Sequence, residues 1–113
     1  MVCTFVRAIS KVSIKGQVNK SILKEAIRLL EGFRGQSESD YTNFLGINLV
    51  NGGFARITIT KEGLEIEGIS QEQVKKQIPM LYQAKVQEAI LKRMGYQTKV
   101  EKAKDKIRIR AVR

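Results

Sequence analysis

Two runs of strictly alternating residues constrain the fold of this chain most. The first run, at residues 55–60, reads ARITIT, and the second, at residues 64–68, reads LEIEG. A period of two is typical of a strand with one buried and one solvated face. Because only Lys61-Glu62-Gly63 separates the runs, they form an antiparallel hairpin. The rest of the chain must therefore cover the apolar face of an antiparallel sheet.

Further strands are expected on both sides of this hairpin. Residues 4–15 are rich in β-branched side chains, and residues 44–50 lead into Asn51-Gly52-Gly53, whose residues suit a hairpin turn. The polar segment at residues 35–43 reads as a loop. At the end of the chain, QTKVEK and KIRIRAVR predict a terminal hairpin with its turn near residues 103–105.

A first helix is predicted after Gly16. Asn19 or Ser21 is its N-cap, apolar residues then recur at helical spacing as far as Phe33, and Gly32 and Gly35 stop it.

A second helical region starts at residues 70–73, where SQEQ fits a capping box and the flanking Ile69 and Val74 fit a hydrophobic staple. Pro79 lies inside this region, so either a kink or two helices meeting near Ile78 are expected. Residues 80–94 carry apolar side chains over a wide arc, which indicates deep burial or a subunit contact. Their polar stripe consists of Lys85, Glu88 and Lys92.

The expected order is β-α-β-β-β-α-β-β. It favours an α+β domain at residues 1–113, with helices packed on one face of a mainly antiparallel sheet and the second helix kinked or broken near Pro79. The length of 113 residues suits a single domain.

The composition removes most catalytic chemistry. The chain contains no histidine and only one cysteine, Cys3, so the commonest general base, the commonest metal ligand and an intramolecular disulfide are all absent. We expect a non-enzymatic protein without cofactor or metal ion. The N-terminus alternates polar and apolar residues, unlike a signal peptide, and no apolar stretch is long enough for a membrane span. We therefore expect a cytoplasmic protein with no membrane partner.

Charge is distributed unevenly along the chain, whose net charge is +10. Residues 38–72 carry a net −4, between net charges of +5 before them and +9 after them. An asymmetry of this kind is typical of an interaction surface for polyanions. Lys20, Lys24 and Arg28 share one helix face. On the last strand Arg108 and Arg110 share a face that Lys99 joins from the preceding strand, and Glu101 lies among these cations. The candidate nucleic-acid-binding residues are Lys20, Lys24, Arg28, Lys99, Lys102, Lys104, Lys106, Arg108 and Arg110.

Both ends of the chain resemble a conserved family of unknown function that is encoded in cyanobacteria and algal plastids. At the start, Cys3-Thr4-Phe5 leads towards ILKEAIRLLEG, and at the end LYQAKVQEAILKRMGYQ precedes two basic strands. The middle departs from the family, which is richer in aromatic residues there, whereas this chain has no Trp. The resemblance implies the order strand, helix, sheet, helix and hairpin. It transfers no functional residue, because the family has no assigned activity.

Three functions remain open. The first is a binding module for nucleic acid (DNA or RNA) or a ribonucleoprotein surface. The second is an assembly subunit, a homodimer or a protein that docks on a partner through residues 80–94. The third is a divalent-dependent phosphoryl-transfer enzyme that uses Glu62, Glu65 and Glu67. Against the first function, the chain offers few exposed aromatic rings on which bases could stack.

Overall fold

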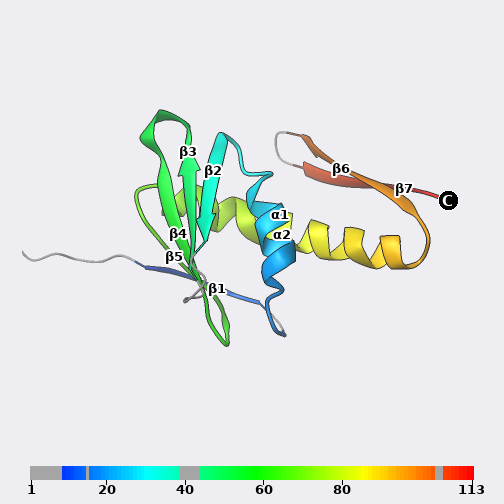
Figure 1. Cartoon of the computed structure of the whole chain (residues 1–113), viewed down its shortest axis with the longest axis horizontal. Coiled ribbons are helices and arrows are strands. Elements are labelled where there is room, and N and C mark those ends of the chain that lie inside the picture. Colours follow the sequence, from blue (N-terminus) through cyan, green and yellow to red (C-terminus); the bar gives the residue numbers. More distant parts are fainter. Residues whose placement is uncertain (1–8, 15, 39–43, 104–105) are drawn as a thin grey trace, which may run out of the picture.

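The computed structural model describes residues 9–14, 16–38, 44–103 and 106–113, and its fold class is α+β, as predicted (Figure 1). Five antiparallel strands form one sheet in the order β1-β5-β4-β3-β2, and β6 and β7 form a second, two-stranded sheet. The strands are β1 Ser10–Ser13, β2 Phe33–Glu38, β3 Phe44–Leu49, β4 Phe54–Ile59, β5 Gly63–Glu67, β6 Gln97–Ala103 and β7 Lys106–Val112.

Two helices, α1 Lys20–Ile27 and α2 Gln71–Arg93, cover one face of the larger sheet. The strand register places Leu45, Ile57 and Ile66 in one row across β3, β4 and β5, and all three are fully buried. Leu23 of α1 and Ile78 of α2 complete the same apolar core. Beyond the sheet α2 continues, and the β6–β7 hairpin lies along its second half (Figure 1).

The first helix starts as predicted and ends earlier. Asn19 is the N-cap, and its side-chain oxygen accepts a hydrogen bond of 3.2 Å from the Ile22 amide. The helix ends at Ile27, not at Phe33, because the chain tightens into i→i+3 turns and then bends at Gly32, where φ is +75°.

The predicted loop at residues 35–43 was wrong for its first part. Residues 33–38 form the edge strand β2, which pairs with β3 and contains an irregularity at Arg34. The observed order therefore contains one more strand than the predicted order, and residues 39–43 lie outside the described residues.

The second helix runs through Pro79 without a break, as a single helix of 23 residues. The buried Ile78, Leu81 and Tyr82 hold both sides of the proline to the core, which offsets the lost backbone hydrogen bond. No described helix is both long and apolar enough to span a membrane.

The predicted capping box and staple at the start of α2 were wrong. The Ser70 hydroxyl accepts a hydrogen bond of 3.0 Å from the Phe54 amide of β4 and caps no amide of its own helix. Ile69 is 82% exposed, so it cannot pack on the buried Val74. The Ser70 side chain thus links the helix to the sheet in place of the local capping pattern.

Gly63 is the glycine on which the fold depends most. Its φ is +150°, and a Cβ there would overlap the Val12 carbonyl oxygen and lie 2.8 Å from the Ile14 amide nitrogen of the paired chain segment. We expect Gly63→Ala to lower the free energy of unfolding by about 3 kcal/mol or more. At Gly35 an added Cβ meets no atom within 4 Å, so Gly35→Ala should stay within about 0.5 kcal/mol of the parent. Urea unfolding followed by circular dichroism measures both, and equal stability of the two variants would contradict the account.

Candidate nucleic-acid interface

The register of the terminal hairpin gathers four cations on one face. Lys99 pairs with Arg110, Glu101 with Arg108, and Ala103 with Lys106. Directly paired residues of an antiparallel ladder project to the same side. Lys99, Lys106, Arg108 and Arg110 therefore share one face of the β6–β7 hairpin, and all four are exposed. We call these four residues the cationic face. The predicted juxtaposition of Lys99 with Arg108 and Arg110 is confirmed.

One carboxylate lies within the cationic face. Glu101 Oε1 lies 3.4 Å from Nε of Arg110, and the Arg110 side chain remains 62% exposed. This pair holds one guanidinium across the middle of the hairpin. Since the pair is solvated, it contributes little to stability.

The opposite face of the hairpin is seated on the rest of the protein. Ile107 packs against the apolar core, and Val100 and Ile109 are half-buried. Lys102 belongs to this face, because it is a residue of β6 and pairs with Ile107. Its Nζ donates a hydrogen bond of 2.9 Å to the Leu29 carbonyl oxygen. Lys102 is thus a structural anchor in this structure, while Lys104 lies outside the described residues.

A buried carboxylate marks the part of α2 on which the hairpin packs. Glu88 is only 6% exposed, and its Oε1 lies 3.1 Å from Nζ of Lys85 and 3.6 Å from Nζ of Lys92. Burial raises the pKa of Glu88, but the hydrogen bond from Lys85 and the charges of both lysines outweigh it, so the pKa lies below its ordinary value. Glu88 is therefore ionised at neutral pH. Thr98 of β6 is close enough to contribute to the lowered pKa of Glu88, so Glu88 faces the hairpin, while Lys92 of the predicted polar stripe is 59% exposed.

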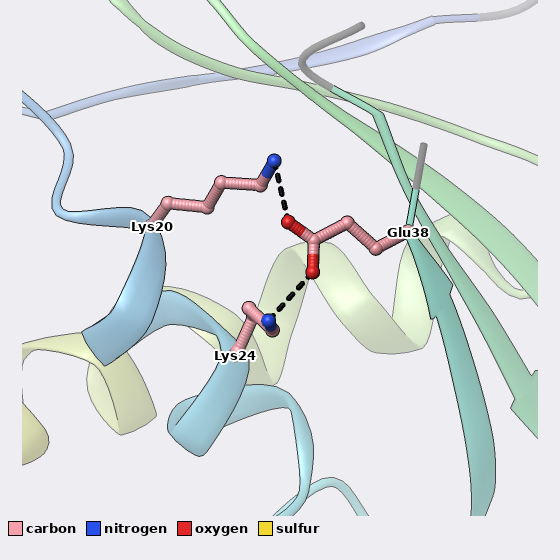
Figure 2. Close-up of polar contacts among 3 residues, drawn as sticks. All are labelled: Lys20, Lys24 and Glu38. Carbon is pink, nitrogen blue, oxygen red and sulfur yellow. Dashed lines mark hydrogen bonds and ion pairs between the residues drawn. The ribbon is translucent and has the colours of Figure 1, made fainter. Parts of the chain in front are cut away.

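In the second predicted cluster, on α1, two of the three cations share one carboxylate from β2. Figure 2 shows Nζ of Lys20 and Nζ of Lys24 reaching the two carboxylate oxygens of Glu38, at 2.7 and 2.6 Å. Arg28 is exposed and forms the C-cap of α1. Because Lys102 binds the carbonyl oxygen of the next residue, Leu29, the hairpin reaches the end of α1 at Arg28.

The two lysines lower the pKa of Glu38 to about 2 through their hydrogen bonds and charges. A carboxylate with a depressed pKa stabilises the folded state above its ordinary pKa of 4.5, and this contribution is lost as the pH falls towards 2. Carbon-detected NMR titration should place the midpoint of Glu38 near 2 in the parent protein. Lys24→Ala should move it upward, and a parent midpoint near 4.5 would show that the ion pairs do not form in solution.

The carboxylates proposed for a magnesium site do not converge. Among the described residues, no group of three or more His, Cys, Asp or Glu side chains could hold a metal ion. Glu67 instead receives a hydrogen bond of 2.9 Å from Nε of Arg56 on the neighbouring strand. Glu65 lies opposite Thr58 and Lys11 in the sheet.

Arg113 is a residue of this region that sequence reasoning missed. Its guanidinium lies over the Tyr96 ring, 5.1 Å from the ring centroid. Gln97 pairs with Val112, so the next pair of the same register places Tyr96 opposite Arg113. The contact could therefore have been predicted once the hairpin register was known. Tyr96 follows Gly95, and the amides of both residues form a Schellman motif at the end of α2.

No protein-family model matches this chain, and neither the curated proteins nor the solved structures contain a significant match, so the resemblance to the cyanobacterial and plastid family stays a prediction.

Proposed function

We propose that this protein is a non-enzymatic nucleic-acid-binding module, and that the cationic face of the β6–β7 hairpin is its binding surface. The observation that carries the proposal is the cross-strand register, which holds Lys99, Lys106, Arg108 and Arg110 on one exposed face. Two of the four are arginines, whose planar guanidinium groups bind phosphate or base edges in a bidentate manner.

The seating of the hairpin also supports the proposal. A two-stranded hairpin is marginally stable alone, but here Ile107 and the Lys102–Leu29 hydrogen bond attach its opposite face to the core and to the turn that follows α1. The cations are thus presented on a preorganised surface, which lowers the conformational entropy lost on binding. On α1, by contrast, Lys20 and Lys24 already share a carboxylate partner, so we assign them a smaller role.

The experiment is fluorescence anisotropy with labelled DNA and RNA oligonucleotides over a series of salt concentrations. Each of the four cations that neutralises a phosphate should add about −0.9 to the slope of log K against log salt on duplex DNA, up to a limit of about −3.6. The absence of binding to any DNA or RNA at low salt would refute the proposal. So would binding that salt does not weaken.

We place this function in the cytoplasm. The single cysteine permits no intramolecular disulfide, which suits a reducing compartment.

A second candidate function, self-assembly through α2, is favoured by a different surface. By helical spacing Met80, Ile90 and the C-cap residue Met94 share one face of α2, and each is more than half exposed. Gln83 and Gln87 complete this stripe. The occupant we assign is a second copy, since a stripe of apolar and amide side chains without a carboxylate can pack on itself. Sedimentation at high salt should then give a dimer that Ile90→Lys dissociates, and a monomer at every concentration would exclude this candidate.

A further inference from the structure

The β6–β7 hairpin is a separate two-stranded ribbon. It forms its own sheet and shares no ladder with the five-stranded sheet, and in Figure 1 it lies along α2 at a distance from strands β3 to β5. Neighbouring strands lie about 4.8 Å apart. The major groove of B-form DNA is about 12 Å wide and admits an α-helix or a two-stranded β-ribbon. The width of the ribbon therefore fits the major groove of B-form DNA.

A ribbon can enter a groove only if one of its faces is attached to the protein and the other is exposed, and the β6–β7 hairpin meets both conditions. One face packs on the protein through Ile107 and Lys102. The other is the cationic face, which is exposed along both strands. A ribbon that enters a groove must present one face to the base edges while the body of the protein stays outside, and here only the cationic face is free to do so.

The cationic face carries the residue types that proteins use to read base edges, namely arginine and a carboxylate. Arg108 and Arg110 occupy the middle of β7, and arginine donates two hydrogen bonds to O6 and N7 of guanine. Glu101 lies opposite Arg108 and beside Arg110, and a carboxylate accepts from N4 of cytosine, the partner of guanine. A surface that only tracked phosphates would gain nothing from a carboxylate at its centre. Lys99 and Lys106 flank this group and remain free for the phosphates.

Single strands and double-stranded RNA fit this face poorly. Proteins that bind single strands stack the bases on aromatic side chains. The residues of β6 and β7 that share the cationic face include no aromatic residue. The nearby Tyr96 is half-buried and already covered by Arg113. The major groove of A-form RNA is too deep and narrow for side chains to read.

Building on the proposed function, we infer that the ligand is duplex DNA and that the β6–β7 ribbon enters its major groove, with Arg108 and Arg110 as the guanine-reading residues. Glu101 then orients Arg110 and reads the paired cytosine.

The test compares a G·C-containing duplex with the same duplex in which 7-deazaguanine replaces guanine. This replacement removes the N7 acceptor in the major groove and leaves the phosphates and the minor groove unchanged. The parent protein should bind the 7-deazaguanine duplex about tenfold more weakly, the loss expected for one bidentate contact. The Arg108→Ala/Arg110→Ala variant should bind both duplexes equally. The separate strands of the duplex should bind at least about tenfold more weakly than the duplex itself.

Other results would separate the major-groove inference from the proposed function. Equal affinity of the parent for both duplexes, or tighter binding of single strands or of double-stranded RNA, would overturn the major-groove inference and leave the proposed function intact. Binding to none of these nucleic acids would overturn both.

Discussion

Arg108→Ala/Arg110→Ala should weaken binding to duplex DNA at least about 30-fold, because each arginine that contacts a base edge or phosphate is worth about 1–3 kcal/mol. The slope of log K against log salt should also become shallower if either residue neutralises a phosphate in the parent complex. Both side chains are exposed on the cationic face, so the variant should unfold at the same urea concentration as the parent. Fluorescence anisotropy measures affinity and slope together.

The matched control removes the same number of charges elsewhere. Lys11→Ala/Lys61→Ala takes two exposed lysines from β1 and from the β4–β5 turn, which lie away from the hairpin (Figure 1). If binding depends on the cationic face, this control should lose less than about threefold in affinity, through long-range attraction alone. Equal losses in the two variants would mean that net charge, and not this surface, binds the ligand.

Glu88→Ala should lower the free energy of unfolding by about 3 kcal/mol, the largest effect we expect from a single charged residue. The substitution leaves the ammonium group of Lys85 without its carboxylate partner, and the Lys85 side chain is only 16% exposed. It also leaves a cavity where the hairpin packs on α2. Urea unfolding followed by circular dichroism gives the change in stability.

A double variant separates the charge from the packing. Lys85→Met/Glu88→Leu removes both charges and keeps most of the side-chain volume, so it should recover most of the lost stability. Glu72→Ala removes an exposed carboxylate from the same helix and should change stability by less than about 0.5 kcal/mol. If Glu88→Ala were as mild as Glu72→Ala, Glu88 would not be a buried partner of Lys85.

The elements that side-chain patterns specify were predictable from the sequence. Alternation identified β4 and β5, and the turn residues identified the β3–β4 hairpin, in which Asn51 has φ +60° and Gly52 has φ +76°. Asn19 capped the first helix as predicted. In the terminal hairpin, alternation alone placed Arg108 and Arg110 on one face, and a single register then added Lys99.

The elements that depend on backbone pairing or on distant partners were not predictable. The edge strand β2 is polar and needs only the backbone of β3, so its sequence carries no apolar alternation. Ser70 fits a local capping box but binds Phe54, sixteen residues away. Glu38 pairs with both Lys20 and Lys24 only because β2 lies beside α1. The positions of Lys102 and Glu88 likewise depend on where the hairpin packs.

The measurement that tests the binding surface most directly is an NMR titration of the ¹⁵N-labelled protein with a G·C-containing DNA duplex. We expect the amide shifts to concentrate at residues 97–103 and 106–112 and the side-chain Nε resonances of Arg108 and Arg110 to move with them. The outer face of the five-stranded sheet, which carries Thr58 and Glu65, should stay unchanged. Shifts centred on that outer face or on α1, with the hairpin unaffected, would contradict the account.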